Sequence, residues 1–423
     1  MATTVGTWAR RGAAPGSREF LAIVTTCMGA SALSIDLLLP ALPDMRADFG
    51  LAPGDTEISR IITGYFLGLA LGQLVYGPMS DRYGRRRMLQ IGMAVFVVGA
   101  VASVAQTSLA GLVACRFVWG LGAAAPRSLS VAMVRDTFQG DAMARTMSLI
   151  MATFVLIPIF APAVGAGVLA VAPWRGVLWL QAGIGLALAL WSVRLPETLH
   201  EADRRSVSPR SLAVAARTVF RNRQTLSFAL AITASFGILT SYIGTSEVII
   251  DEVFGEADRF PLIFGVLACP LAVGSLVAAR IVSRIGLARL VRAGAAYLLI
   301  AGLALAGVAI ATDGRPSLWA FGLAIALLLP AVTLVIPSSN TAAMAPLGQV
   351  AGMGAAIVGT VSTAGGALLG TLADGAFDGT MQPFALHVAA YCAIATLAIL
   401  LLARGPTPRT GGIDVITEPV SPA

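Results

Sequence analysis

Three charged side chains lie well inside long apolar stretches of the chain, away from their ends, where an ionised group is costly and is usually retained for a function. Asp36 lies about six residues before the end of the stretch 20–42, and Arg116 lies about seven residues into 109–132. If both stretches are transmembrane helices, a rise of about 1.5 Å per residue places both side chains roughly 10 Å below one membrane surface, where they can pair. Arg127 follows Arg116 by about three helical turns and lies on nearly the same face.

Asp36 and Arg116 are therefore candidates for proton coupling. Burial beside an apolar cavity favours the neutral form of a carboxylate, and a nearby arginine favours the ionised form. The balance of these two effects can allow Asp36 to exchange protons. The alternative is a structural Asp36–Arg116 ion pair that never changes its protonation. For Arg127, the alternative to a cavity position is a side chain that extends to the cytoplasmic surface.

Other polar residues in the apolar stretches are weaker candidates for lining a substrate cavity. Glu247 lies near the end of the stretch 224–248, where we expect it at the membrane surface or, alternatively, facing a substrate. The further candidates, each able to form hydrogen bonds, are Tyr65, Gln73, Ser241, Tyr242 and Asn340.

The composition of the 423 residues indicates a polytopic membrane protein. Hydrophobic residues make up 57% of the chain and charged residues 12%, about half of what a soluble protein needs to cover its surface. Apolar stretches of roughly 20 residues, long enough to cross a bilayer as helices, recur along the chain. They predict an all-α fold with twelve transmembrane helices at 20–42, 58–79, 88–106, 109–132, 144–170, 174–194, 224–248, 260–281, 289–311, 317–338, 350–372 and 382–403.

A polar, arginine-rich segment divides these helices into two groups of six. We expect an N-terminal tail at 1–19, an N-terminal six-helix bundle at 20–194, a linker at 195–222, a C-terminal six-helix bundle at 223–403 and a C-terminal tail at 404–423. Of the arginines, 22 fall on the side of the two tails and the linker, and five fall on the other side. By the positive-inside rule, both termini and the linker are cytoplasmic.

The two halves share a weak internal repeat. Three residues after the second helix recur at an offset of 202 residues after the eighth, where Arg284, Gly286 and Arg289 match Arg82, Gly84 and Arg87. Two related six-helix halves are typical of transporters whose halves rock about a central site.

Several functional classes lack the residues that they need. All basic residues behind the net charge of +7 are arginines, mostly in short gaps between apolar stretches, which fits topology rather than nucleic-acid binding. The four cysteines and two histidines are isolated, so we expect neither a disulfide framework nor a metal site. We find no nucleophile–base arrangement of an enzyme and no glycine-rich lysine loop of an ATP-driven pump. The chain is expected to be no enzyme and to use no cofactor.

The loop 77–89, GPMSDRYGRRRML, resembles the signature loop of the major facilitator superfamily. Its two glycines allow close helix approach and a tight reversal, and its aspartate can pair with arginines or a helix N-terminus. The resemblance implies a conformational-switch loop made of Gly77, Asp81, Arg82, Gly84, Arg85 and Arg86. A plain positive-inside anchor is the alternative. The second-half loop has Ser283 in place of an aspartate, so only the first loop can form a carboxylate-dependent lock.

Further stretches are similar to the bicyclomycin-resistance (Bcr/CflA) branch of drug:proton antiporters in that superfamily. They are 35–43, 116–125, 134–136, 158–165, 174–175 and 195–198, and more thinly 337–346 and 351–352. The resemblance implies that Pro158, Pro162 and Gly165 form the antiporter motif of the fifth helix, with a simple packing kink as the alternative. The branch commonly has Gln where this chain has Trp119, and we expect the bulky ring to reshape the substrate cavity.

These observations favour a secondary active transporter that exports small lipophilic compounds, including drugs, by proton-coupled antiport and alternating access. The alternative is proton-coupled uptake of a small nutrient or metabolite, because one fold serves both. The expected partners are a lipophilic substrate, protons and the lipid bilayer, without nucleic acid. We expect a monomer in the bacterial inner membrane.

Overall fold

The computed structural model describes residues 12–204 and 209–402. Within these ranges the secondary structure consists of fourteen α-helices and short 3-10 or π segments, without any strand. The prediction of an all-α fold is confirmed. The predicted C-terminal tail at 404–423 and the first eleven residues of the N-terminal tail lie outside the described residues.

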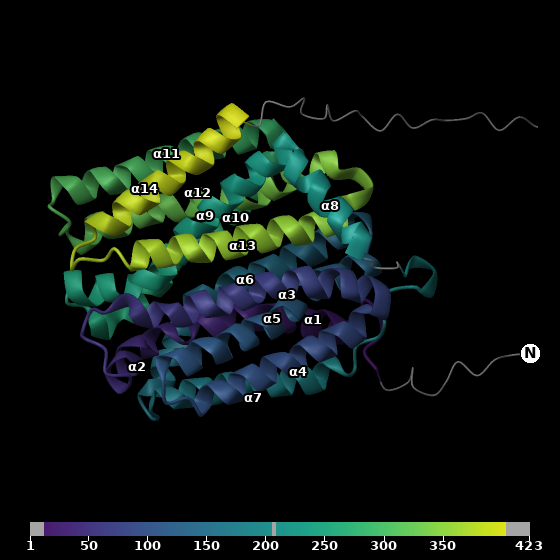
Figure 1. Ribbon diagram of the computed structural model, residues 1–423, viewed down its shortest axis with the longest axis horizontal. Coiled ribbons are helices and arrows are strands. Elements are labelled where there is room, and N and C mark those ends of the chain that lie inside the picture. The colour runs from purple at the N-terminus through teal and green to yellow at the C-terminus, as the bar shows by residue number, and fades with distance from the viewer. Residues whose placement is uncertain (1–11, 205–208, 403–423) are drawn as a thin grey trace, which may run out of the picture.

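The helices form two bundles joined by one additional helix. The N-terminal bundle contains α1 (Arg18–Asp36), α2 (Leu42–Asp48), α3 (Arg60–Tyr83), α4 (Arg85–Val104), α5 (Leu109–Thr137), α6 (Gly140–Leu169) and α7 (Trp174–Ser192). The C-terminal bundle contains α9 (Arg223–Val248), α10 (Phe260–Ile285), α11 (Leu287–Ala311), α12 (Leu318–Met344), α13 (Ala351–Asp374) and α14 (Gln382–Leu397). Figure 1 shows the N-terminal bundle below the C-terminal bundle, with α2 at one end of the molecule and α8 (Pro209–Arg221) at the other. We call these the α2 end and the α8 end.

Eleven helices of the described residues are long and apolar enough to cross a membrane. They correspond to eleven of the twelve predicted spans. The remaining prediction, 174–194, is α7, whose 19 residues include Arg175 and Gln181, polar side chains that lower its mean hydropathy. Because α7 packs lengthwise against α4, it completes the N-terminal bundle beside the other spans.

The first predicted span ends earlier than the apolar pattern indicates. The helix α1 stops at Asp36, and a 3-10 turn at Leu39–Ala41 leads into α2. Pro40 and Pro43 explain this end, because proline lacks a backbone N–H and disfavours helical conformation in the preceding residue. Asp36 is therefore a helix-terminal residue rather than one in the middle of a continuous helix.

The internal repeat corresponds to one backbone conformation in both halves. Gly84 separates α3 from α4 at φ 99° and ψ 149°, and Gly286 separates α10 from α11 at φ 78° and ψ 157°. Side chains rarely adopt a positive φ of this kind, so glycine is needed at both positions. The matching glycines thus make the same tight reversal in each half.

The linker contains an amphipathic helix that the sequence prediction lacked. Ala215 and Val219 of α8 are buried against Leu347 and against Ile357 of α13. The three- and four-residue spacing of the apolar side chains in α8 places them on one helical face. The linker therefore packs on the C-terminal bundle at the α8 end.

The two bundles meet along α3 and α13. Near the α2 end, the hydroxyls of Thr63 and Thr371 lie 2.7 Å apart. Further along, the Thr360 hydroxyl donates to the carbonyl of Ala70 at 2.8 Å. On a second contact line, Gly265 of α10 lies against α6, where an added Cβ would lie 2.7 Å from the carbonyl oxygen of Ile159. Threonines and glycine at these contacts let the bundles approach closely, as is common between membrane helices.

Candidate functional site

A cavity with about 890 Å³ of empty space, partly open to solvent, lies between the two bundles. The N-terminal bundle contributes Ser31, Ala32, Ile35, Asp36, Phe66, Arg127, Phe154, Val155 and Pro158. The C-terminal bundle contributes Phe236, Leu239, Tyr242, Ile243, Phe264, Ala268, Leu271 and Thr333. Both halves are needed to form this cavity.

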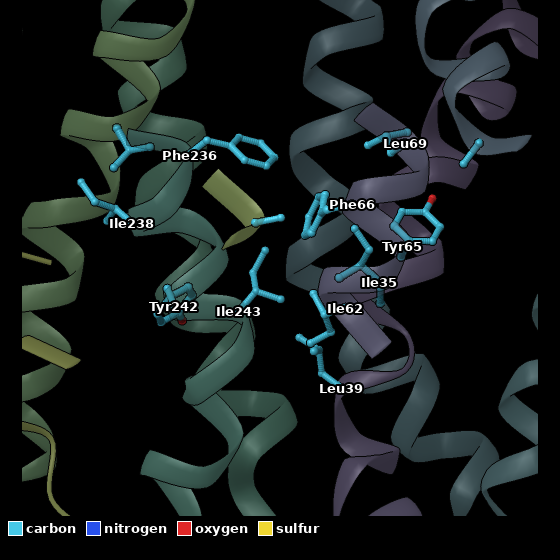
Figure 2. Close-up of a cluster of buried hydrophobic side chains, with 14 of the residues drawn as sticks. Ile35, Leu39, Ile62, Tyr65, Phe66, Leu69, Phe236, Ile238, Tyr242 and Ile243 are labelled. Atoms are coloured by element: carbon cyan, nitrogen blue, oxygen red, sulfur yellow. The ribbon is translucent and has the colours of Figure 1, made fainter. Parts of the chain in front are cut away.

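Aromatic rings form much of the cavity wall. Phe66 and Phe236 meet edge to face across the two bundles, with ring centroids 5.3 Å apart. Tyr242 and Phe264 stack within the C-terminal bundle at 5.4 Å. Figure 2 shows Phe66 of α3 and Phe236 of α9 on facing helices, with Ile243 on the same side of α9. Such rings bind apolar and aromatic groups of many shapes.

Asp36 and Arg127 are the charged residues of the cavity wall. Asp36 is 5% exposed and forms no ion pair with any described residue. The hydroxyl of Tyr242, which lines the same cavity, has no hydrogen-bond partner among the described residues. The wall is thus apolar with a few polar groups, the usual composition of a ligand site.

Arg116 does not pair with Asp36 in this structure, although the expected depth of the two side chains allowed a pair. Its guanidinium lies over the rings of Tyr65 and Trp119, 4.7 Å from each centroid, and Nη2 donates to the carbonyl of Ser34 at 2.9 Å. Two aromatic faces and a carbonyl stabilise this buried cation in place of a carboxylate. The structural Asp36–Arg116 pair loses its support, and Asp36 is left without a charged partner.

Tyr65 and Trp119 belong to the core behind the cavity, contrary to prediction. Both are fully buried, and neither lines the cavity. Tyr65 donates its hydroxyl to the carbonyl of Ser31 at 2.8 Å, and the Trp119 ring contacts Phe96 edge to face at 5.5 Å. Trp119 points toward α4 rather than α9, because close packing against Gly99 fixes its backbone there.

The other predicted polar residues also lie outside the cavity wall. Gln73 donates to Thr363 at 3.4 Å along the α3–α13 contact. Ser241 donates to a carbonyl of its own helix, and Asn340 is exposed near the end of α12. Of the predicted cavity residues, Arg127 and Tyr242 do line the cavity.

The predicted motif of the fifth helix lies on α6 beside the cavity and α1. Pro158 lines the cavity, and Pro162 follows one turn later. Gly165 packs so closely on the carbonyl of Leu37 that a side chain would clash. The motif therefore sits next to the end of α1 that carries Asp36, which connects the fifth-helix motif to the cavity.

A buried ion pair joins the bundles at the α2 end. Arg46 of α2 and Glu247 of α9 form a bond of 2.7 Å, and their side chains are 5% and 3% exposed. The Nε of Arg46 also donates to the carbonyl of Asp55 at 2.9 Å. Glu247 was predicted at the membrane surface or facing substrate, whereas it binds a residue of the opposite bundle. This contact holds the two bundles together at the α2 end.

The signature loop forms a charge cluster within the N-terminal bundle. Arg85 binds Asp81 of α3 and, at 3.0 Å, Asp136 of α5. The Arg85 guanidinium also donates to the hydroxyl of Ser80 at 2.6 Å. The predicted pairing of Asp81 with an arginine is present, and it ties together three helices of one bundle.

The carboxylate at the N-terminus of α4, the helix that follows this loop, belongs to Glu197 and not to Asp81. Glu197 accepts hydrogen bonds from the backbone N–H groups of Arg85, at 2.8 Å, and Arg86, at 3.3 Å, in the first turn of α4. A negative charge is favourable there because the N–H groups of the first turn lack helical partners. A side chain at Gly84 would clash with Glu197, which gives the glycine a second role besides its positive φ. Arg86 also donates to the carbonyl of Val193 at 2.7 Å.

The ends of α1 and α7 meet beside this cluster. Arg194 forms an ion pair with Glu19. The hydrogen bond to Glu19 and the negative charge of its carboxylate raise the pKa of Arg194. The start of α1 thus lies at the α8 end. At the same end, Thr396 near the end of α14 donates to the carbonyl of Ala295 near the start of α11, so the start of α1 and the end of α14 lie at the same end of the molecule.

The fold, the interbundle cavity and the signature loop define a transporter with two related bundles. The chain matches the Major Facilitator Superfamily over residues 24–370 and belongs to that family. The family prediction is confirmed, and with it a multi-pass membrane transporter rather than an enzyme.

Relatives agree with the bicyclomycin-resistance branch that the motifs indicate. The bicyclomycin resistance protein homolog of Haemophilus influenzae is 26% identical over 373 residues, which are 87% of this chain and 92% of that protein. The MFS-type transporter YdgK of Bacillus subtilis is 27% identical over 88% of this chain and 92% of its own. The multidrug resistance protein MdtL of Escherichia coli is 32% identical over 52% of this chain and 55% of its own.

Solved structures show the same fold. The human organic anion transporter MFSD10 has a TM-score of 0.68 at 21% identity, covering 92% of this chain and all of that one. The xylose transporter XylE of Escherichia coli has a TM-score of 0.67 at 13% identity, covering 90% and 96%. These likenesses show the fold alone, the same arrangement of two helical bundles.

Proposed function

We propose that the protein exports small lipophilic compounds in exchange for protons, by alternating access. The observation that carries this proposal is the aromatic cavity between the bundles, with the buried carboxylate of Asp36 in its wall and no ion pair to that carboxylate. An apolar cavity suits lipophilic substrates, and a carboxylate without a charged partner can bind and release a proton as the cavity changes its exposure.

The cavity wall favours export of lipophilic compounds over uptake of a sugar. A sugar needs many hydrogen-bonding side chains around it, whereas rings and aliphatic groups make up most of this wall. The names of the bicyclomycin resistance homolog and of the multidrug resistance protein MdtL point to drugs as substrates of those proteins, and support a drug substrate here.

The arginine distribution supports a cytoplasmic α8 end. The cluster around Arg85, the helix α8 and the start of α1 all lie there, together with most arginines of the loops. Both termini are then cytoplasmic, and the closed α2 end faces the outside of a bacterial inner membrane. Since the cavity is formed within one chain, we propose a monomer as the functional unit.

In this cycle Asp36 takes up a proton when the cavity opens outward and releases it when the cavity opens inward. Proton release to the cytoplasm leaves the carboxylate ionised, which changes the polarity of the wall for an incoming substrate. Arg127 is the other charged residue of this wall, and it stays positively charged throughout the cycle. The protonation of Asp36 therefore supplies the electrostatic change that exchange requires.

Drug susceptibility of a bacterial strain lacking its own exporters tests the function. Cells that express the protein are expected to survive higher concentrations of lipophilic antibiotics, and a protonophore should remove that protection. Asp36→Asn should remove it as well, at equal expression. Asp44→Asn, an exposed aspartate of the neighbouring α2, is the matched control and should keep it.

Purified protein in liposomes tests the coupling directly. Addition of a transported drug should release protons from the parent protein and not from Asp36→Asn, while drug binding by the variant stays measurable. Full substrate-induced proton release by Asp36→Asn would exclude this residue as the coupling group. Accumulation of a sugar or other nutrient on addition of a proton gradient would favour uptake instead.

A further inference from the structure

A second buried carboxylate lies far from the cavity wall, at the α2 end. Asp374 is the last residue of α13 and is 3% exposed. Its carboxylate occupies the space beside Gly244 of α9, where any side chain would clash with it. Two helices of the C-terminal bundle therefore hold this carboxylate in place.

The N-terminal bundle covers the same carboxylate. The 3-10 turn Thr56–Ser59 before α3 packs against α9 and α13, and the Ser59 side chain, 1% exposed, lies close enough to interact with the Asp374 carboxylate. The other polar contact between α3 and α13 at this end is the Thr63–Thr371 bond, one turn further into the molecule. If the bundles separate at the α2 end, Ser59 moves away from Asp374 and exposes it to solvent.

Inside the closed end, the carboxylate is poorly compensated. Its Oδ1 has no hydrogen-bond partner among the described residues, and no described cation pairs with it. An ionised carboxylate in this position loses its hydration without gaining an ion pair, whereas a protonated carboxyl does not carry that cost. Closure is thus easier with a proton on Asp374.

Charged groups on the neighbouring elements are engaged elsewhere. On α9, Glu247 binds Arg46, and on α3, Arg60 binds Glu57 at 2.9 Å. On α14, the hydroxyl of Tyr391 donates to the carbonyl of Leu369, and His387 bonds to the carbonyl of Pro383. Tyr391 lies close enough to interact with the charge of Asp374, and as a neutral phenol it offers no positive charge.

We propose that Asp374 is a proton-binding site of the α2 end, which must be occupied before that end can close. The ligand is a proton from the solution on the α2 side. Because the site is sealed from the α8 end, the proton returns to the same side on opening and is not transported. This assignment rests on the proposed alternation between two states, but it is independent of whether Asp36 couples transport.

The proposal fixes the sign of the pH response. The closed state holds one proton more than the open state, so acidification favours closure and alkalinisation favours opening. Between the two proton affinities, the ratio of closed to open molecules should change about tenfold per pH unit.

Spin labels on the two bundles at the α2 end measure this ratio. Ala52, in the loop after α2, and Ala311, at the end of α11, are exposed and can carry labels as Ala52→Cys and Ala311→Cys. The four native cysteines are replaced by alanine. In lipid nanodiscs, the short-distance population should grow as the pH falls from 9 to 5.

Asp374→Asn should stay mostly closed with a population that does not depend on pH. Asp378→Asn, an exposed aspartate four residues later, is the matched control and should keep the response. If Asp374→Asn does not fold, Ser59→Ala keeps the carboxylate and should shift the midpoint of the response. The proposal is overturned if the distance in the parent protein does not depend on pH, or if Asp374→Asn keeps the pH response. It is also overturned if the midpoint of the response in Ser59→Ala equals that of the parent.

Two further arms separate this site from other causes. Asp36→Asn should keep the pH response of the distance even if it abolishes proton-coupled export, and loss of the response in that variant would assign it to Asp36. Replacement of NaCl by choline chloride at constant pH should have no effect. A distance change driven by sodium instead of protons would refute a proton site.

Discussion

The Arg46–Glu247 ion pair gives a quantitative prediction for the equilibrium between closed and open states. Glu247→Gln leaves Arg46 in a closed α2 end without its charged partner, while one hydrogen bond to the carbonyl of Asp55 remains. Removing one partner of a buried ion pair costs about 3–5 kcal/mol. The pair joins the two bundles, so the cost falls on the closed state and is relieved when Arg46 reaches water on opening.

A cost of about 3–5 kcal/mol corresponds to a roughly 140- to 3,700-fold shift of the closed-to-open ratio. Spin labels at Ala52→Cys and Ala311→Cys should report a gain in the long-distance population in Glu247→Gln. The exchanged variant Arg46→Glu with Glu247→Arg should restore part of the closed population, because it retains opposite charges. Glu57→Gln, which removes a surface pair with Arg60, should have little effect.

The reasoning fails if Glu247→Gln leaves the distance distribution unchanged while the protein is folded and binds substrate. It also fails if Glu247→Gln lowers the unfolding temperature of the closed and the open state equally. The ion pair would then stabilise the folded bundles and not the closed state. Substrate binding measured from the α8 side should weaken in the variant, since fewer molecules are closed at the α2 end.

Three more variants test the roles of individual residues. Gly84→Ala should destabilise the protein by about 1–3 kcal/mol, measured as a lower thermal unfolding midpoint, because of its positive φ and the clash with Glu197. Trp119→Ala should cost about 3–5 kcal/mol in unfolding free energy without selectively changing the drug profile, because the ring is buried against Phe96. Phe236→Ala should weaken binding of lipophilic substrates about tenfold, measured by titration, because the ring lines the cavity.

Each variant has a clear counter-result. Gly167→Ala is the control for Gly84→Ala, because Gly167 lies in a helix with open space around it. Equal unfolding midpoints for the two variants would contradict the conformational argument. A selective change of drug profile in a stable Trp119→Ala protein would indicate that the Trp119 ring belongs to the cavity wall. Unchanged affinity in Phe236→Ala would separate the cavity from substrate binding.

The fold was predictable because membrane helices leave a strong sequence signal. Apolar runs of about 20 residues identify spans, and the repeated arginines and glycines around Gly84 and Gly286 identify the halves. The end of α1 at Asp36 was missed because apolar residues continue past the helix end. The linker helix α8 was missed because its short amphipathic pattern is hidden among arginines.

The cavity was less predictable than the fold. Hydropathy marks a buried charge such as Asp36, but it does not distinguish a phenylalanine in a cavity wall, such as Phe236, from one that faces lipid. Trp119 and Tyr65 illustrate the opposite error. Their side chains carry a polar group, which indicated the cavity, but they pack in the core. Helix rotation decides between these positions, and it is set by packing between helices distant in sequence.

Asp374 and Arg46 were also missed as partners between the bundles. The end of the predicted span at 350–372 falls two residues before Asp374, so it counted as part of a loop. Arg46 lies after the predicted span 20–42, where its charge indicates a loop, and its partner Glu247 lies 201 residues away. Long-range partners of this kind have no local pattern, and a sequence signal for them would require compensating substitutions among relatives.

The position of the charge cluster has a consequence for biosynthesis. The partners of Arg85 and Glu197 lie between Ser80 and Leu199, so the N-terminal bundle can complete this cluster while the ribosome is still translating the linker. Arg46 must wait for Glu247, 201 residues later, which is roughly 10–40 s at common rates of chain elongation. During that interval Arg46 of the newly inserted half keeps its hydrogen bond to the carbonyl of Asp55 but lacks its carboxylate partner, so the ion pair at the α2 end is one of the last contacts of the transporter to form.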